Sequence, residues 1–364
     1  MLSIDLATHG MNPAVAFGIL KRHLYAFYRH LTVRKLLNFC RTEYSRLTKK
    51  TSVGSFPYIL KLETTNMCNL SCAYCYDGRR PPLEGERPYG RMSLEGFKGL
   101  IDELAPYLFK INLYGFGEPF LDPQCIDMIA YATRHNVGVG VSSNMNFVDD
   151  TLARRIVESG LEVLIFSCHG VTQESYRKFM VKGNMGLAFK NISEVIAQRE
   201  LAGSNTPFID WQFCVTGFNQ GEIEAARARA IELGIDQVRF IKPFFPEDAA
   251  QEWFSDLFPR HSSTILVNQG DARRQTGCSW PYRSAYINYD GGVLPCCKDT
   301  RLIANDFGNV FRGSFASIWN NERYVSSRAL IARGQAGCQT MCARCSITRD
   351  KRRGSSAPNG TSGR

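Results

Sequence analysis

Three cysteines stand within eight residues of one another, directly after an apolar segment typical of a β-strand. Cys68, Cys72 and Cys75 have the spacing C-x3-C-x2-C, and the segment 58–62 precedes them. Three thiolates at this spacing can bind one small inorganic centre, for which a cubane iron–sulfur cluster is the natural candidate. Three ligands for four irons leave one iron open, much as a catalytic zinc site keeps one open position. The alternative is a structural zinc site with a fourth ligand elsewhere, although zinc sites usually contain paired C-x2-C motifs.

Strand-like and helical segments alternate between Pro57 and Pro243. Such alternation predicts βαβ units and an α/β fold with a parallel sheet, whose active site lies at the carboxyl ends of the strands. Six repeats are fewer than the eight of a closed barrel. The predicted strands span 58–62, 109–114, 138–142, 163–167, 209–215 and 238–241, and the predicted helices lie near 93–104, 122–135, 149–159, 186–199 and 221–234.

A second group of cysteines lies near the C-terminus. The sequence Asp-Gly-Gly at 290–292, between two apolar segments, predicts a hairpin that brings Cys296 back toward Cys278. A helical segment at 317–333 follows, and then a C-x2-C motif at 342–345. This group can hold an iron–sulfur cluster or, alternatively, a structural zinc ion. Its six cysteines are Cys278, Cys296, Cys297, Cys338, Cys342 and Cys345.

The first cysteine motif, with the aromatic Tyr74 just before its third cysteine, resembles the signature of the radical S-adenosylmethionine (SAM) superfamily. The resemblance implies an open, partial (β/α)6 barrel of the TIM type, in which the cysteine loop follows the first strand. It also implies that the open iron of a [4Fe-4S] cluster chelates the amino and carboxylate groups of SAM. An electron from that cluster then cleaves SAM to a 5′-deoxyadenosyl radical.

The C-terminal hairpin, helix and C-x2-C motif resemble the SPASM/Twitch extension of radical SAM enzymes. The full SPASM pattern has seven cysteines for two clusters, whereas this chain has no cysteine after Cys345. The resemblance therefore implies one auxiliary [4Fe-4S] cluster, fully ligated and suited to electron transfer. Its implied ligands are Cys278, Cys296, Cys342 and Cys345, and Cys297 or Cys338 can replace one of them.

Two further strand ends and one lysine resemble SAM-binding positions of the family. Residues 114–119 resemble the Gly-Gly-Glu-Pro segment that holds the amino group of SAM, and 142–144 resemble the Thr/Ser-Asn-Gly segment that contacts the ribose, with Met145 in place of the glycine. Lys182 stands where relatives often carry an arginine near the SAM carboxylate. The implied cofactor-binding residues are Tyr74, Gly115, Gly117, Glu118, Pro119, Ser142, Ser143, Asn144 and Lys182.

His169 follows the fourth predicted strand, where many relatives with an auxiliary cluster carry aspartate. At a strand end that faces the radical, a histidine can accept a proton or bind substrate, because it titrates near neutral pH. A capping or packing role is the alternative. Gln212, Arg239 and Lys242 are further polar residues on the last two strands that can contact substrate or SAM, or serve the structure alone.

The net charge of +10 is concentrated at the two ends of the chain. Between Val15 and Lys50 there are nine Lys and Arg residues and one acidic residue, Glu43, whereas 51–348 is close to neutral. The charge balance of the central region therefore gives no sign of a nucleic-acid groove. Residues 13–50 have helical periodicity, so they can form basic amphipathic helices that lie on an anionic membrane, on a partner, or across the main domain.

These features predict an order of domains along the chain. We expect a helical N-terminal extension at 1–55, the partial barrel at 56–245, a bridge at 246–276, the SPASM/Twitch domain at 277–348 and a disordered tail at 349–364. The start of the chain has no signal-peptide pattern, and no apolar run is long enough to span a bilayer. Clustered cysteines in a long chain also indicate a reducing compartment, so we expect a cytoplasmic protein.

The resemblance favours a net oxidation, because a fully ligated auxiliary cluster can take an electron from a substrate radical. We expect dehydrogenation of a sugar, cyclitol or other small metabolite, with a flavodoxin or ferredoxin as reductant. A ribosomal-peptide maturase and a radical epimerase remain alternatives, the latter with Cys214 or Cys168 returning hydrogen to the substrate. Outside enzymes, the alternative is an iron–sulfur electron-transfer protein.

Overall fold

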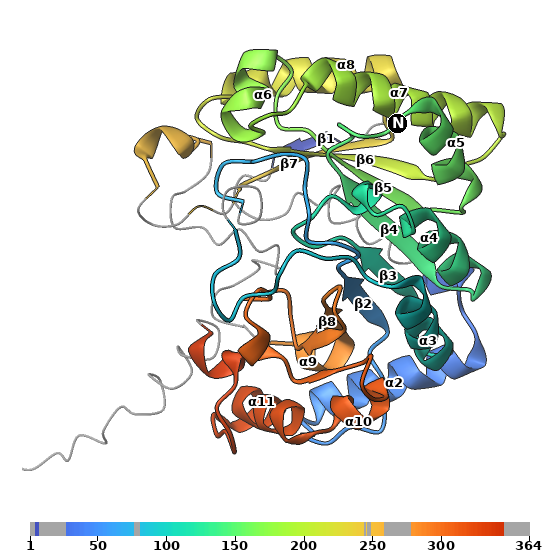
Figure 1. The fold of residues 1–364 in the computed structure, drawn as a ribbon, viewed down its shortest axis with the longest axis vertical. Helices are drawn as coiled ribbons and strands as arrows, with labels where there is room; N and C mark the ends of the chain where they lie inside the picture. The colour runs from blue at the N-terminus through green and yellow to red at the C-terminus, as the bar shows by residue number, and fades with distance from the viewer. Residues whose placement is uncertain are drawn as a thin grey trace, which may run out of the picture.

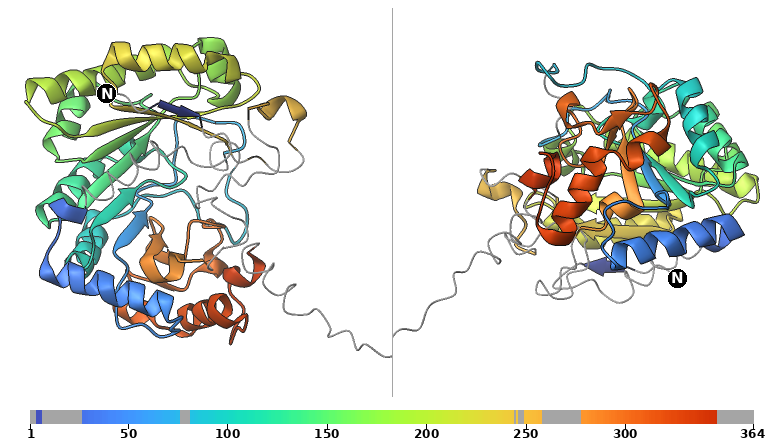
Figure 2. Two further views of the ribbon diagram at one scale, coloured as in Figure 1. Left: turned by 180° about the vertical axis from the view of Figure 1, so that it is seen from behind. Right: turned by 90° about the horizontal axis from the view of Figure 1, so that it is seen from below.

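The fold is built on one ten-stranded, largely parallel sheet (Figure 1). The computed structural model describes residues 4–6, 27–75, 81–243, 245, 249–257 and 278–345. Along the sheet the strands follow the order β1-β7-β6-β5-β4-β3-β2-β8-β9-β10. The predicted α/β class is confirmed, and helices cover the outer face of the sheet (Figures 1 and 2).

The six predicted barrel strands are all present and pair in parallel with their neighbours in chain order. Their apolar residues alternate with polar ones on the shorter strands, as burial of Leu60 and Leu62 but not Lys61 on β2 illustrates. One face of the sheet therefore packs under helices, and the other faces the barrel interior. The strands are β2 (Ile59–Leu62), β3 (Lys110–Leu113), β4 (Gly138–Ser143), β5 (Val163–Ser167), β6 (Phe208–Cys214) and β7 (Gln237–Ile241).

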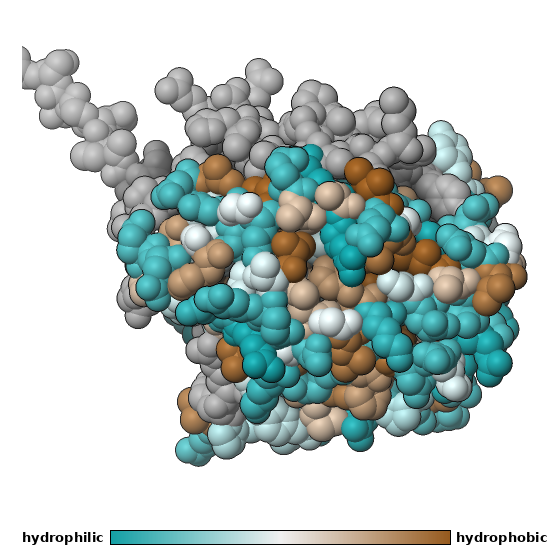
Figure 3. All heavy atoms as spheres, turned by 90° about the horizontal axis from the view of Figure 1, so that it is seen from above, coloured by the Kyte–Doolittle hydropathy of each residue, from teal (hydrophilic) through white to brown (hydrophobic). Residues whose placement is uncertain are grey.

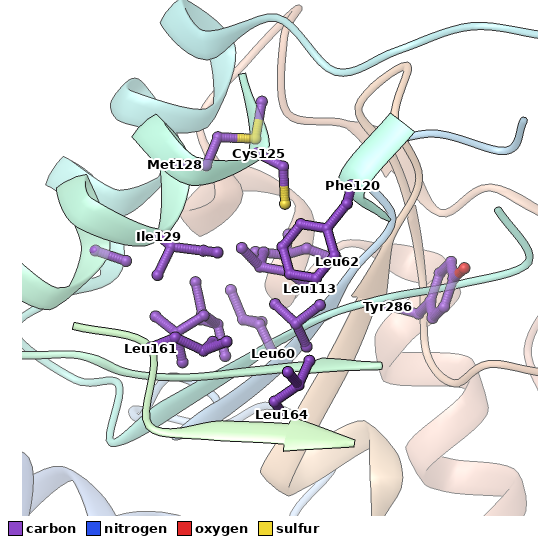
Figure 4. Close-up of a cluster of buried hydrophobic side chains, with 14 of the residues drawn as sticks. Leu60, Leu62, Leu113, Phe120, Cys125, Met128, Ile129, Leu161, Leu164 and Tyr286 are labelled. Carbon is purple, nitrogen blue, oxygen red and sulfur yellow. The ribbon is translucent and has the colours of Figure 1, made fainter. Parts of the chain in front are cut away.

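The helices between these strands begin at side-chain caps that the sequence supplies. Ser93, Asp149, Thr172 and Asn184 each accept a hydrogen bond from the backbone N–H three residues later. Their apolar faces meet the strands in a continuous core, part of which is shown in Figure 4. The helices are α3 (Leu94–Leu104), α4 (Cys125–Arg134), α5 (Asp150–Glu158), α6 (Gln173–Phe179), α7 (Met185–Leu201) and α8 (Ile223–Leu233), with 3-10 turns at Pro119–Leu121, Gln220–Glu222 and Gln251–Trp253.

Two strands extend the parallel sheet beyond the six predicted. β1 (Ile4–Leu6) pairs with β7, and the sequence contains no signal for a strand in this segment of the N-terminal extension. β8 (Ser284–Ile287) pairs in parallel with β2, so the C-terminal region continues the barrel sheet. Both pairings join segments far apart in sequence, so local periodicity could not predict them.

The C-terminal region contains the predicted hairpin. β8 and β9 (Gly292–Leu294) are antiparallel, and β10 (Gly308–Asn309) adds a third strand. The predicted helical segment at 317–333 is present as two helices, because α10 (Phe315–Trp319) ends and the Asn321 side chain caps a new helix, α11 (Glu322–Arg333). The short helix α9 (Trp280–Arg283) precedes β8, and 3-10 turns lie at Ile303–Asn305 and Met341–Arg344.

Helix α2 (Val33–Leu47) packs across the outside of the barrel, as one of the predicted alternatives requires. Asn38 and Thr42 donate hydrogen bonds to the carbonyl of Phe56, and Arg283 pairs with Glu43. Among the helices that the structure describes, none has the length and apolarity to cross a membrane. The predicted helical residues 13–26, most of the bridge and the predicted tail lie outside the described residues.

Candidate active site

The first cysteine motif lies in the loop that follows β2, at the carboxyl edge of the sheet. The backbone N–H groups of Ser71 and Ala73 donate to the carbonyls of Val181 and Phe179, at 3.0 and 2.7 Å, so this loop is fixed to the segment after α6. The Cys68 Sγ accepts the N–H of Leu70 at 3.4 Å. Such a hydrogen bond suits a thiolate ligand.

The three thiols are close enough to influence one another. The pKa of Cys72 is raised by burial and, further, by the neighbouring Cys75 and Cys68. In the described part of the chain, however, no three His, Cys, Asp or Glu side chains converge as the ligands of one metal ion do. In a cubane held by three cysteines, each thiolate binds a different iron and the fourth iron stays open.

The glycines after β3 let the backbone meet the cysteine loop. A Cβ on Gly117 would lie 2.2 Å from the carbonyl oxygen of Thr65, and the next residue, Glu118, donates its N–H to Met67 at 2.8 Å. A Cβ on Gly115 would lie 2.3 Å from a carboxylate oxygen of Glu63. Gly117 is therefore required by close approach, because the atoms near it are backbone, whereas those near Gly115 belong to side chains. The sequence Pro119–Leu121 then turns away as a 3-10 helix.

The Glu118 carboxylate joins the ends of β3 and β4. One oxygen accepts the N–H of Asn144 at 2.8 Å, and the other accepts the N–H of Phe120 at 3.3 Å. Burial raises its pKa to about 7, although hydrogen bonds from Asn144 and Ser143 act against the shift. The carboxylate is thus engaged with the protein itself, which indicates a positioning role for this residue.

The segment after β4 touches the cysteine loop as well. The Asn144 Nδ2 donates to the side-chain oxygen of Asn69 at 2.9 Å and lies 3.9 Å from the Cys68 Sγ. Met145 adopts a φ of +56°, and its N–H donates to the Ser143 hydroxyl at 3.0 Å. This left-handed backbone explains why glycine suits the position in the segment that it resembles. Ser142 pairs with Ser167 of the next strand, at 3.0 Å between the hydroxyl oxygens.

His169 is buried and held by the backbone. Its Nδ1 accepts the N–H of Cys214 at 3.2 Å, so the ring proton of the neutral form sits on Nε2. Burial lowers its pKa to about 4, and its ring packs edge-on against Phe179 at 4.9 Å. Burial and the hydrogen bond to Nδ1 favour the packing role over that of a proton acceptor. Cys168 is fully buried in the core.

An aromatic cluster covers the mouth of the barrel, and the sequence reasoning missed most of it. Tyr74 packs against Phe245 and Trp253, with ring centroids 5.0 and 5.2 Å apart, and both of these contact Phe179. Trp253 belongs to a segment fixed on Gly217, where an added Cβ would meet the Glu252 carbonyl at 2.3 Å. The segment that carries Phe245 and Trp253 has no helical or strand periodicity, so its aromatic residues were the signal that could have revealed the cluster. Lys182 is exposed beside this cluster, after Val181, in a left-handed conformation.

The barrel interior carries charged and polar side chains. The Lys61 ammonium lies 4.6 Å from the Tyr114 ring centroid and 5.8 Å from that of Tyr286, and the Glu63 carboxylate attracts it as well. Arg239 binds both oxygens of Asp210 through its Nε, at 2.8 and 2.9 Å, and reaches Gln212 at 3.2 Å. Lys61 is the main interior residue that sequence reasoning missed.

The second cysteine set comes together from three distant segments. Burial raises the pKa of Cys278 to about 12, with further contributions from the nearby Cys342 and Cys345. Burial also raises the pKa of Cys296, which lies close to Cys342 and Cys278. These four are the predicted ligands. Of the two replacements, Cys297 is exposed and Cys338 lies against the carbonyl of Glu322 at 3.9 Å.

A buried guanidinium links the segment after the first cysteine motif to the C-terminal region. Arg87, in the segment between the cysteine loop and α3, pairs with Asp290 and Asp306 of the C-terminal region. Its Nε also donates to the carbonyl of Thr300 at 3.1 Å. The hairpin that carries Cys296 is thereby held against the cysteine loop region.

Comparison with known proteins agrees with both sites. The radical SAM superfamily model matches residues 62–197, and a SPASM model, described as an iron–sulfur cluster-binding domain, matches residues 278–346. This chain belongs to the radical SAM superfamily. It is a radical SAM enzyme with a C-terminal SPASM domain, and its cofactors are SAM, a [4Fe-4S] cluster and an auxiliary iron–sulfur cluster. The non-enzymatic alternative is therefore set aside.

Several characterised radical SAM relatives are similar over most of the chain. It is 29% identical to the mycofactocin maturase MftC of Mycobacterium ulcerans over 288 residues, or 76% of this chain and 73% of that protein. It is 25% identical to the tungsten-containing aldehyde ferredoxin oxidoreductase cofactor-modifying protein of Pyrococcus furiosus over 297 residues, covering 73% and 82%. It is 20% identical to the SAM-dependent 2-deoxy-scyllo-inosamine dehydrogenase of Niallia circulans, covering 79% and 92%.

Solved structures agree with the fold. SuiB of Streptococcus suis, bound to S-adenosylmethionine, has a TM-score of 0.61 at 14% identity, covering 92% of this chain and 83% of that one. The enzyme anSMEcpe with bound AdoMet has a TM-score of 0.55 at 15% identity, covering 80% and 84%.

Proposed function

We propose that this radical SAM enzyme dehydrogenates a small polar metabolite such as a sugar or cyclitol. The observation that carries the proposal is the position of the second cysteine set. Strand β8 lies directly beside β2, and Arg87 holds the hairpin of Cys296 against the cysteine-loop region. An electron acceptor at the second set would thus lie beside the barrel in which the substrate reacts.

When bound, SAM at the first cluster supplies the radical that takes a hydrogen atom, and the auxiliary cluster supplies an acceptor for one electron. Conversion of CH–OH to C=O then also requires loss of one proton. The ligands that we propose are Cys68, Cys72 and Cys75 for the first cluster, and Cys278, Cys296, Cys342 and Cys345 for the auxiliary one. The SAM-binding residues predicted from the sequence remain proposals of the same kind.

The interior of the barrel supports a substrate rich in hydroxyl or acidic groups. Lys61, Gln212 and Arg239 project hydrogen-bonding groups from three strands, and the ammonium of Lys61 rests on tyrosine rings. Buried polar groups of this kind discriminate strongly in favour of substrates that pair with them. A flavodoxin or ferredoxin is the reductant that we propose.

Peptide modification is the second candidate. The similarity to a mycofactocin maturase over 288 residues favours it, because that relative's name assigns it to maturation. The substrate would then be a precursor peptide in place of a metabolite. Epimerisation is a third possibility, with Cys214 as the candidate thiol, because Cys214 lies near Cys72.

The deciding experiment measures whether the substrate loses two electrons, as a dehydrogenation requires. Anaerobic enzyme is incubated with SAM, reductant and candidate polyols or peptides in deuterated water, and products are analysed by mass spectrometry. We expect one molecule of product, two mass units lighter than the substrate, for each SAM consumed. A product of unchanged oxidation state that carries solvent deuterium would establish epimerisation, and reaction with peptides alone would establish the second candidate.

Iron analysis tests the ligand assignment separately. Reconstituted parent protein should hold about eight irons, and a Cys68→Ala/Cys72→Ala/Cys75→Ala variant about four, with SAM cleavage lost. In a Cys342→Ala/Cys345→Ala variant we expect about four irons with SAM cleavage retained but product formation lost. Full iron content in either variant would contradict the assignment.

A further inference from the structure

Helix α2 turns its polar face toward the protein. Lys35, Asn38, Thr42 and Ser45 are its buried residues, with exposures of 2%, 4%, 0% and 4%. Lys35 donates to the carbonyl of Asn136, and further polar contacts with the barrel run through Asn38, Thr42, Arg34 and Glu43. The helix is thus attached to the domain by hydrogen bonds, where an amphipathic surface helix normally uses its apolar side.

The apolar face of α2 consequently points away from the protein. Val33, Leu37, Tyr44 and Leu47 are 77%, 52%, 59% and 67% exposed. Their spacing places them on one side of the helix, together with two less exposed neighbours. We call this surface the outer stripe of α2, and its residues are Val33, Leu36, Leu37, Cys40, Tyr44 and Leu47.

Positive charge borders the outer stripe. Arg41, Lys49 and Lys50 are exposed. The one acidic residue between 15 and 50, Glu43, is turned inward and binds Arg283 and Arg46. An exposed apolar stripe bordered by cations and free of exposed acids complements a surface that is both apolar and anionic.

We infer that α2 is a peripheral binding site for an anionic phospholipid membrane. The stripe would enter the boundary between headgroups and acyl chains, and the bordering cations would contact lipid phosphates. In the sequence before α2, apolar residues recur at helical intervals among basic ones, namely Phe17, Leu20, Leu24, Phe27 and Leu31. The charge argument separates a membrane from a second copy of this chain, because two such basic helices would repel each other.

The opposite end of the molecule provides a matched control. Helices α7 and α8 lie at the far end from α2 (Figure 1), and the face seen from above shows apolar residues scattered among hydrophilic ones (Figure 3). Leu201 on α7 and Ile231 on α8 are 82% and 59% exposed. Replacing these two by glutamate changes net charge and exposed apolar area much as the same replacement of two stripe residues does.

Vesicle sedimentation tests the inference with the full chain. Wild type should sediment with vesicles of phosphatidylcholine and phosphatidylglycerol, and the bound fraction should fall with added salt or with phosphatidylcholine alone. We expect Leu37→Glu/Tyr44→Glu to lower the apparent affinity by about tenfold or more, and Leu201→Glu/Ile231→Glu to change it less than about twofold.

Three results would overturn the inference. They are absence of wild-type binding to anionic vesicles, equal loss in the two double variants, and light scattering that finds a wild-type dimer which the α2 variant dissociates into monomers. Thermal unfolding of both variants verifies that they are folded. SAM cleavage in solution should remain at the wild-type rate in both, because neither pair belongs to the active site.

Discussion

At the scale of single residues, Gly117 marks the closest approach between the cysteine loop and the end of β3. In Gly117→Ala the new methyl group would overlap the carbonyl of Thr65, so the loop must move. We expect a loss of about 1–3 kcal/mol in unfolding free energy and a larger loss of SAM cleavage. Gly221→Ala is the control, since nothing lies within 4 Å of that added Cβ. Wild-type SAM cleavage by Gly117→Ala would refute the argument.

The buried His169 should make stability depend on pH. Its pKa is lowered from 6.5 to about 4 by burial, so the folded protein resists protonation that the unfolded chain accepts. The stability is fully present above pH ~6.5 and is lost as pH falls toward ~4, by about 3 kcal/mol in total. His169→Gln should flatten this dependence in urea titrations at several pH values. An unchanged slope would mean that the imidazole is not buried as described.

The sequence could predict which residues lie near the cysteine loop where those residues belong to compact motifs. Glu118 and Asn144 stand in short segments after strands, and the structure brings both to the loop. Phe245 and Trp253 belong to no motif and were missed, although they pack on Tyr74. Lys61 was missed because a lysine within an apolar strand does not by itself report which face it occupies.

At the scale of elements, Arg87 links the two cysteine regions. Arg87→Met removes the partner of Asp290 and Asp306, which are partly shielded from water. Since isolated carboxylates in such positions are unfavourable, we expect unfolding free energy to fall by about 2–3 kcal/mol. Arg227→Met is the control, because its partner Glu224 is exposed. The measurement is chemical unfolding of both variants, and equal stability would show that Arg87 does not couple the regions.

Whether an element could be predicted depends on whether its signal lies in its own local sequence. Strands β2 to β7 follow from alternation and from their own apolar segments, so all six were predicted. The pairing of β8 with β2 joins Ile59 to Ser284 and has no local signal. The sequence likewise did not show which face of α2 packs on the barrel, because periodicity reveals an apolar face but not whether that face meets the protein.

At the scale of the whole molecule, the SPASM region and the barrel share one sheet. A chain ending at residue 245 would leave β2 without its neighbour β8 and would expose residues of the common core, such as Tyr286 and Leu62. We expect it to aggregate on expression, whereas removal of 349–364 should leave a folded protein. Soluble yield and circular dichroism test both, and a well-folded 1–245 fragment would contradict the shared-sheet description.

The same pairing has a consequence during synthesis on the ribosome. Because β2 is made early and β8 late, the edge of β2 that pairs with β8 stays unpaired until most of the chain has been synthesised. Contacts of such long sequence separation form slowly, and an incomplete sheet attracts other chains meanwhile. The yield of active enzyme from a heterologous host should therefore be governed by translation speed and chaperone supply as much as by the provision of iron.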